Sequence, residues 1–510
     1  MNYADLLRMT MPETALEVAA LLVLLVDLGF LRKSSLRLRI AASATLGILG
    51  CGVALMAIPL QAQGGLQDGG NGLLLSAGGS TAVAQVGILG LTVLTQLLLF
   101  DSTFTRHVGE FVAITLMSAT GGLLIAAAQD LLVIFIGLEL LSLGLYVLTA
   151  FAKRSGKSAE AAIKYYLFGG MSAAFLLFGF SYLYGITGST NLQQIMRATY
   201  GSNTVNATPL LMVALVMIAA GLGFKIAAVP FHLWAPDTYE GAPAPAAAFI
   251  ASVSKVASFA LLISIGTAAL HVFGDTHVVQ FVIVTSGRLP RYIGFAAPWS
   301  FALTILAVAS MVFGNLAALA QTSVRRLLAY SAIAHAGYML LALAYFSHSP
   351  VSAQAILYYI LTYGLTAIGA FAVVGVVERV NGSDQMDAFA GLHRRNPILA
   401  CVMLVLFLSL AGIPPLVGFW AKFNLFTAVL EVAKGSVPFG LVALAVGMSA
   451  VSLYYYLQVL KRAFVVPALD DRRIRVHPVT LTALLLITLG VVMAGCFPAL
   501  LQGWMQQFYS

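Results

Sequence analysis

Five ionisable side chains lie inside segments that are otherwise as apolar as membrane-spanning helices. They are Glu139, Lys164, Lys225, Lys255 and Lys422. A charged group at the centre of a bilayer costs about 2.5–3.5 kcal/mol on insertion scales, so such residues are rare unless they have a function. Lysine and glutamate side chains can take up and release protons. We therefore expect this chain to move protons or ions across a membrane.

The composition indicates a polytopic membrane protein. Of 510 residues, 60% are hydrophobic and only 9% are charged, whereas soluble proteins have about 25% charged residues. The net charge of +8 is more typical of basic cytoplasmic loops than of nucleic-acid binding in such a chain. The three cysteines are far apart, which disfavours zinc and iron–sulfur sites. No phosphate-binding or dinucleotide-binding glycine loop is present, so we expect no nucleotide or flavin on this chain.

Apolar stretches long enough to span a membrane begin at fourteen places, near residues 14, 38, 83, 108, 130, 160, 207, 241, 300, 326, 353, 396, 437 and 478. Of the 27 Lys and Arg residues, eighteen lie in loops after odd-numbered segments and only four lie in loops after even-numbered ones. The positive-inside rule then places the odd loops in the cytoplasm and both termini outside. We expect an all-α protein with 14 transmembrane helices and with long connecting loops at 61–82 and 273–298.

An internal repeat relates two parts of the chain. Residues 162–167 (AIKYYL) resemble residues 355–360 (AILYYI) at an offset of 193, and five helices separate the two copies, so the copies have opposite orientations. The same offset brings Lys225 within one turn of Lys422, and glycine and proline interrupt the helix beside each lysine. Interrupted helices at matching positions of inverted repeats are typical of a transport path. The alternative for the six-residue repeat is a chance match, and the alternative for each helix break is a simple packing kink.

Depth within the membrane suggests a switch. Glu139 lies nine residues past Asp130, the expected helix start, and is therefore about 14 Å deep. Burial disfavours the charged form of a carboxylate and of an ammonium, and a nearby opposite charge reverses both effects. If the carboxylate moves away, the lysine tends to release its proton. We expect Glu139 to act in this way on Lys225 or Lys164; a static ion pair is the alternative.

Lys225, Lys255 and Lys422 would form a chain of sites for protons. His335, in the tenth segment, is suited to bridge them because an imidazole titrates near neutral pH, although a lone buried histidine is often structural. The run Tyr454–Tyr456 fits an interfacial belt or helix packing.

Four stretches together resemble the antiporter-like subunits of respiratory complex I. The longest is GLGFKIAAVPFHLWAPDTYEGAP at 221–243, and the others are GLELLS at 137–142, YSAIAHAGY at 330–338, and GIPP with GFWAKF within 412–423. Among the paralogous subunit types, Lys422 favours the one with lysine here over the one with glutamate. The chain ends soon after the fourteenth segment, which disfavours the type with a long C-terminal amphipathic helix. Mrp-type sodium/proton antiporter subunits are the alternative family members.

The resemblance implies a domain organisation and a set of roles. It implies inverted five-helix repeats at 108–272 and 273–465, with helices 7 and 12 broken, between N-terminal helices at 1–107 and a last helix at 466–510. The residues that it implies in proton translocation are Glu139, Lys164, Lys225, Lys255, His335 and Lys422.

The resemblance also implies the setting in which the chain works. It implies a translocase subunit in a bacterial inner membrane, in contact with the lipid bilayer and with other membrane subunits, including adjacent antiporter-like ones. NAD, FMN, iron–sulfur clusters and quinone are expected on partner subunits, and no cofactor or metal is expected on this chain. An autonomous sodium/proton exchanger and a purely structural anchor remain the other functional classes.

Overall fold

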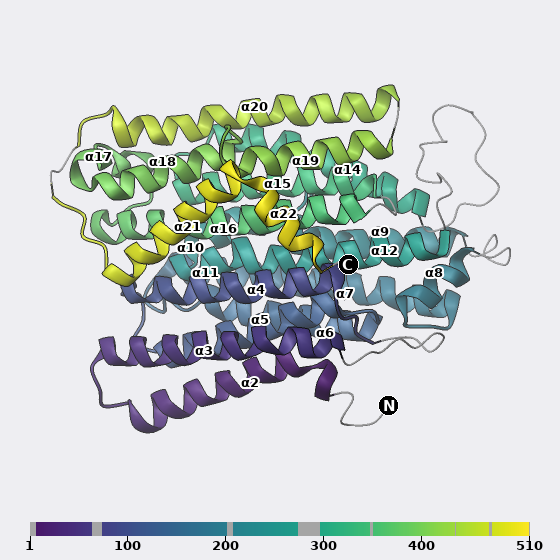
Figure 1. The fold of residues 1–510 in the computed structure, drawn as a ribbon, viewed down its shortest axis with the longest axis horizontal. Helices are drawn as coiled ribbons and strands as arrows, with labels where there is room; N and C mark the ends of the chain where they lie inside the picture. The colour runs from purple at the N-terminus through teal and green to yellow at the C-terminus, as the bar shows by residue number, and fades with distance from the viewer. Residues whose placement is uncertain are drawn as a thin grey trace.

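The chain folds as a stack of long helices that run side by side (Figure 1). The structure is a computed structural model, and it describes residues 7–63, 74–200, 208–273, 296–346, 350–433, 435–468 and 472–508. Within these ranges every element longer than an isolated bridge is helical. Of the predicted loops at 61–82 and 273–298, residues 64–73 and 274–295 lie outside the described residues, and α3 and α4 extend into the two ends of the first loop. Helix α2 begins and α22 ends at the same end of the stack (right in Figure 1).

Twelve spans among the described residues are long and apolar enough to cross a membrane. In the first half they contain α3 (Leu36–Gln63), α4 (Gly79–Leu97) with η2 (Leu98–Asp101), α5 (Val108–Ala127), α6 (Leu131–Thr149), α7 (Gly156–Thr187) and α9 (Thr208–Ile226). In the second half they contain α11 (Ala244–Phe249), η4 (Ile250–Ser254) and α12 (Lys255–Phe273) as one span, then α14 (Ala296–Leu319), α15 (Val324–Ala344), α16 (Pro350–Asn381), α20 (Ser436–Phe464) and α21 (Pro478–Cys496).

The other two predicted segments are interrupted helices. Helix α2 (Met11–Leu24) continues into the π-helical turn η1 (Leu25–Phe30), and α18 (Pro397–Ala411) is separated from α19 (Val417–Val432). The short helices are α8 (Leu192–Tyr200), α10 (Trp234–Gly241), η5 (Met386–Phe389), α17 (Leu392–Arg395) and α22 (Pro498–Gln506). The prediction of an all-helical membrane protein is confirmed. Length and composition give twelve spans rather than fourteen because α18 and α19 are short, at 15 and 16 residues, and α2 with η1 carries three acidic residues, Glu13, Glu17 and Asp27.

Local sequence explains where several helices begin. The Asp130 side chain accepts a hydrogen bond from the backbone N–H of Leu132 at 2.9 Å and starts α6. Asn396 does the same for the N–H of Leu399 at 3.0 Å, and Pro397 follows it at the first helical position of α18. Such caps satisfy N–H groups that have no partner within the helix, and proline has no N–H to leave unpaired.

Both predicted helix breaks are present. Helix α9 ends at Ile226 and is followed by Ala227, at φ 58°, and by the cis peptide bond before Pro230. Helix α18 ends at Ala411 and is followed by Gly412, at φ 87°, and by the cis peptide bond before Pro415. The last carbonyl groups of a helix have no partner within it. Each break therefore leaves backbone oxygens available among the membrane helices.

The same close helix crossing is built twice. A Cβ atom added at Gly121 of α5 would lie 2.5 Å from the backbone nitrogen of Leu141 in α6. A Cβ atom added at Gly314 of α14 would lie 2.7 Å from the backbone nitrogen of Ala334 in α15. Both the two glycines and their two partners are 193 residues apart in the sequence. Small residues let helix backbones approach closely in membranes.

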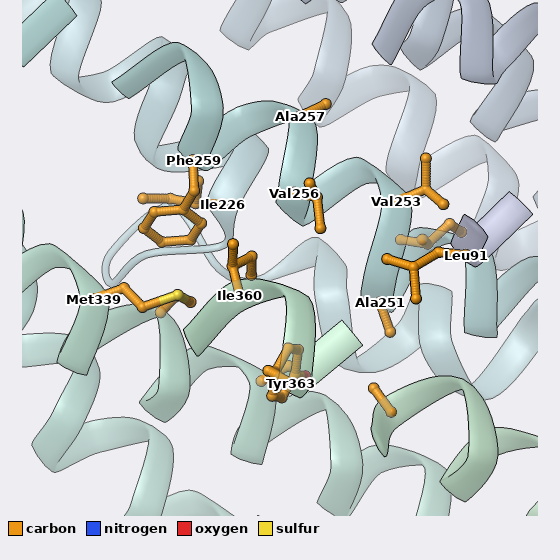
Figure 2. Close-up of a cluster of buried hydrophobic side chains, with 14 of the residues drawn as sticks. Leu91, Ile226, Ala251, Val253, Val256, Ala257, Phe259, Met339, Ile360 and Tyr363 are labelled. Atoms are coloured by element: carbon orange, nitrogen blue, oxygen red, sulfur yellow. The ribbon is translucent and has the colours of Figure 1, made fainter. Parts of the chain in front are cut away.

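The centre of the molecule is where α12 and its preceding turn pack against α15 and α16. Val256, Phe259, Met339 and Ile360 gather there into an apolar layer, with Tyr363 at its edge (Figure 2). The span Ala244–Ala269 is buried throughout its most apolar window. Any charged side chain at the start of α12 is therefore held away from lipid and from solvent.

Candidate functional site

Three lysines and one histidine form a buried line through the helix stack. Lys225, Lys255, Lys422 and His335 are exposed by only 7, 2, 6 and 4%, respectively. They lie on four different helices, α9, α12, α19 and α15. All four were predicted from the sequence as site residues.

Lys225 lies in the last turn of α9, immediately before the first break. Its Nζ donates a hydrogen bond to Ser142 Oγ on α6 at 2.5 Å and lies 5.6 Å from the centre of the Phe224 ring. Glu139, one turn before Ser142 on α6, is half-buried and acts on Lys225 electrostatically. The direct partner of the lysine in this structure is thus a neutral hydroxyl, with the carboxylate nearby.

Lys255 joins the two halves of the chain. It follows the π-helical turn η4, and such turns often occur at functional sites. Its Nζ donates to the backbone oxygens of Ile226 and Ala332, each at 3.0 Å. Ile226 is the last residue of α9, so the first helix break supplies one of the two acceptors. Ala332 belongs to α15, one turn before His335.

Lys422 uses the second break in the same way. Its Nζ donates to the backbone oxygens of Leu410 and Ala411, the last residues of α18, at 3.1 and 2.9 Å. It also donates to Ser449 Oγ on α20 at 2.8 Å, and it lies 5.7 Å from the centre of the Tyr338 ring. Both breaks therefore place backbone oxygens around a buried ammonium group.

His335 has a tyrosine hydroxyl at each ring nitrogen. Its Nδ1 lies 2.7 Å from the hydroxyl of Tyr359 on α16, and its Nε2 lies 3.5 Å from the hydroxyl of Tyr456 on α20. Both Lys255 and Lys422 act on this ring electrostatically. His335 is thus close enough to both lysines for their charges to act on its ring, and its role as a bridge stays a prediction.

Lys164 is in a different environment from the other three lysines. Its side chain is 40% exposed and pairs with Asp237 and Glu160, each at 2.7 Å. Asp237 also pairs with Arg326 at 2.6 Å, so this cluster joins α7, α10 and α15. Burial alone would raise the pKa of Asp237, but hydrogen bonds from Lys164 and Arg326 lower it below its usual value.

Sequence reasoning did not assign roles to the acidic residues that complete this cluster. Asp237 and Glu240 both lie on α10, and Glu240 pairs with Arg326 at 3.1 Å and with Lys157 at 2.9 Å. The signal was present, because two acidic residues follow the first break within WAPDTYEG and two adjacent arginines begin α15. In the fold, α10 and the start of α15 bring these charges together beyond the end of α9, where the first helix break lies.

The chemistry available to the buried line is proton transfer. Each of its three lysines is hydrogen-bonded to neutral oxygens, so the ammonium can lose a proton without leaving an unpaired carboxylate behind. Burial disfavours the charged form of each lysine, and a hydrogen-bonded set of oxygens favours it. Among the described residues, no group of three or more His, Cys, Asp and Glu side chains is arranged to hold a metal ion.

Comparison with known proteins adds an independent line of support. The sequence matches the family described as "NADH:quinone oxidoreductase/Mrp antiporter, TM" over residues 128–289 and 282–449. A relative from Acidobacterium capsulatum, NADH-quinone oxidoreductase subunit N 2, is 48% identical, and the alignment covers 99% of each chain.

Two solved structures have the same fold. A chain of respiratory complex I from Thermus thermophilus with bound aureothin gives a TM-score of 0.76 at 32% identity, over 96% of this chain and 98% of that one. A chain of the Mrp complex from Dietzia sp. DQ12-45-1b gives a TM-score of 0.75 over 97% and 96%. At 20% identity, the second likeness concerns the fold alone.

Proposed function

Because this chain belongs to the NADH:quinone oxidoreductase/Mrp antiporter family, we propose that it is the subunit N type of membrane subunit in a proton-translocating NADH:quinone oxidoreductase. The observation that carries the proposal is the buried line of Lys225, Lys255 and Lys422. Each lysine is held by neutral oxygens, and the two helix breaks supply three of these six acceptors. Such a line carries protons and requires no redox group on this chain.

The proposed pathway is built on two inverted repeats, at 108–272 and 273–465. The matching crossings at Gly121 and Gly314 support this division because both the glycines and their contacts are related by the offset of 193 residues. The N-terminal part, 1–107, and the last part, 466–510, flank the repeats. In this scheme Lys255 connects the two repeats, since it binds one carbonyl oxygen from each of them.

Glu139 is the proposed modulator of Lys225. When the carboxylate is charged and near, it stabilises the ammonium; when it is neutralised or drawn away, Ser142 alone remains as a direct partner and the proton is more easily released. Lys164 has a supporting role in this scheme. It holds Asp237 and so fixes α10, the helix that follows the first break.

The proposed setting is a bacterial inner membrane with both termini on the periplasmic side. The excess of basic residues in loops after odd-numbered segments supports this orientation. The proposed partners are the lipid bilayer, adjacent antiporter-like subunits and the other membrane subunits of the complex. NAD, FMN, iron–sulfur clusters and quinone would reside on partner subunits, and their chemistry would drive the protons through this chain.

An Mrp-type sodium/proton antiporter subunit is the second candidate, favoured by the shared fold. Sodium prefers sites rich in oxygen ligands of the carboxylate and carbonyl type. The buried line instead presents three ammonium groups, two of which, Lys255 and Lys422, already occupy the carbonyl oxygens. The geometry therefore favours protons as the transported species.

Inverted membrane vesicles that contain the whole complex test the proposal. NADH is added, and acidification of the vesicle lumen is followed with a pH-sensitive dye in wild type, Lys225→Ala and the control Lys461→Ala, whose side chain is exposed. We expect Lys225→Ala to lose inhibitor-sensitive acidification and Lys461→Ala to retain it. Sodium-dependent proton exchange without NADH would overturn the proposal and favour the antiporter.

A further inference from the structure

We propose that the hydroxyl groups of Tyr359 and Tyr456 are proton-relay residues that carry protons through His335, between Lys255 and Lys422. This inference rests on the proposed function. It starts from an unusual arrangement: a buried histidine whose two ring nitrogens each face a buried tyrosine hydroxyl. The run that contains Tyr456 was expected from the sequence to serve in packing or at the membrane interface, and the structure places Tyr456 at the site.

The helices that supply the two tyrosines adjoin both lysines. Tyr359 belongs to α16, which packs against α12, the helix that begins with Lys255, and against α19, the helix that carries Lys422. Tyr456 belongs to α20, the helix that also carries Ser449, the hydroxyl partner of Lys422. Ser449 and Tyr456 are seven residues apart, which is about two helical turns and the same face of α20. The two tyrosine hydroxyls thus connect the imidazole to helices that contact both Lys255 and Lys422.

The two repeats carry different residues at the position of His335. By the offset of 193 residues, His335 corresponds to Ser142. In the first repeat, Ser142 binds Lys225 directly. In the second repeat, the corresponding residue is a histidine, which is an acid and a base at once and can pass a proton from one nitrogen to the other. The chemistry at this position therefore changes from holding a lysine to transferring a proton.

The proton transfer balances without an ion pair being left behind. The Tyr359 hydroxyl gives its proton to His335 Nδ1 while Nε2–H gives its proton to the Tyr456 oxygen, and the Tyr456 hydroxyl gives its own proton to Ser331 Oγ, its hydrogen-bond partner. The Lys255 ammonium restores the proton of Tyr359 through water, and Ser331 passes its own hydroxyl proton through water to a neutral Lys422 amine, so that Lys255 ends neutral and Lys422 ends charged. The imidazole ends in its other tautomer, and its return to the first tautomer resets the path.

The neighbouring Tyr455 offers a matched control. It is as buried as Tyr456, lies next to it in the same helix and donates a hydrogen bond to Asn315 Oδ1 at 3.1 Å. Asn315 Nδ2 in turn donates to the Tyr338 hydroxyl at 3.0 Å and to the backbone oxygen of Met311 at 2.8 Å. The Tyr455 hydroxyl also interacts with the Tyr456 hydroxyl and with Ser331 but contacts no imidazole nitrogen, and the bond that it donates ends at an amide, which does not exchange protons as an imidazole does.

Tyr→Phe substitutions in the assembled complex test the proposal, because phenylalanine keeps the ring and removes only the hydroxyl. In NADH-energised inverted vesicles we expect Tyr456→Phe and Tyr359→Phe to slow lumen acidification about 100-fold, the low end of what a positioned proton-transfer group contributes. We expect Tyr455→Phe to behave like wild type. Turnover in D₂O is measured as well, because a change in the solvent isotope effect is expected for a relay and not for a packing residue.

The outcomes separate this inference from the proposed function. Normal acidification and an unchanged isotope effect in Tyr456→Phe, together with a loss in Lys225→Ala, would overturn the tyrosine relay and leave the proposed function standing. An equal loss in Tyr455→Phe and Tyr456→Phe would also overturn it, because packing would then explain both. Normal acidification in Lys225→Ala would remove the proposed function itself. The amount of assembled complex in each membrane is the check on folding.

Discussion

The substitution Lys255→Met separates the charge of the central lysine from its packing. Methionine is unbranched and apolar, so it fills much of the same space without an ammonium group. Lys255 donates two hydrogen bonds of 3.0 Å, to the backbone oxygens of Ile226 and Ala332. A hydrogen bond that involves a charged group contributes about 1.5–3 kcal/mol, so the lost bonds represent about 3–6 kcal/mol in total.

This loss is offset by the removal of a buried charge. The effective penalty for burying one ion in a protein is several kcal/mol. The two effects oppose each other, and we expect the complex to assemble with a stability close to that of wild type. For proton transfer, the loss of the ammonium group is not offset by any gain. A proton that must pass the apolar side chain at this depth faces a barrier of about 2.5–3.5 kcal/mol. Passage through this chain then slows about 100-fold, because each 1.36 kcal/mol is a factor of ten.

The assay is NADH-driven acidification of inverted vesicles, with NADH oxidation recorded in the same sample. If oxidation is strictly coupled to this pathway, both rates fall together; if it is not, fewer protons are moved per NADH. Lys461→Met is the matched control because that lysine is exposed and lies outside the buried line. Normal rates and a normal proton-to-NADH ratio in assembled Lys255→Met would refute the role of Lys255 as the connection between the repeats.

Three further substitutions test other parts of the structure. Ser142→Ala removes the direct hydrogen-bond partner of Lys225 and is expected to slow lumen acidification severalfold in the vesicle assay without preventing assembly, since about 1–3 kcal/mol is at stake. Gly121→Ala places a Cβ atom 2.5 Å from a backbone nitrogen of α6 and is expected to destabilise the helix pair by about 1–3 kcal/mol, measured as a lower thermal midpoint in detergent. Asp237→Asn is expected to cost about 1 kcal/mol at neutral pH. The pKa of Asp237 is lower in the folded protein than in the unfolded chain. The contribution of Asp237 to stability is therefore fully present above the pKa of the unfolded state and is lost as the pH falls through the pKa of the folded state. The melting temperatures of wild type and Asp237→Asn should converge as the pH falls below about 4.

The sequence was sufficient to predict the helical class, both helix breaks and the burial of Lys225, Lys255 and Lys422. These features depend on hydropathy and on glycine and proline, which act locally along the chain. The partners of the lysines were not predictable in the same way. Lys255 binds the backbone oxygens of Ile226 and Ala332, and a backbone oxygen has no signature in the sequence.

Lys164 shows a second limit of sequence reasoning. Its segment has a hydropathy typical of a membrane helix, so the sequence predicts that Lys164 is buried in the membrane like the other lysines. In the structure it lies within three turns of the start of α7 and is 40% exposed, paired with two carboxylates. A charge near the end of a long helix can reach the polar region of the membrane, whereas one in the middle of a helix cannot. Position along the helix therefore separates the two environments, and only the observed start of α7 at Gly156 fixes that position.

The matched breaks explain how one chain can hold three buried ammonium groups. A straight helix pairs its carbonyl oxygens internally, whereas each broken one releases its last oxygens among its neighbours. The first break supplies an oxygen to Lys255, the second supplies two to Lys422, and Lys225 relies on a hydroxyl. In both halves, carbonyl oxygens released by a helix break thus stabilise a buried ammonium group. The two halves differ at Ser142 and His335, where a hydroxyl that holds a lysine is replaced by an imidazole between two phenols, and this difference gives a symmetric scaffold an asymmetric path.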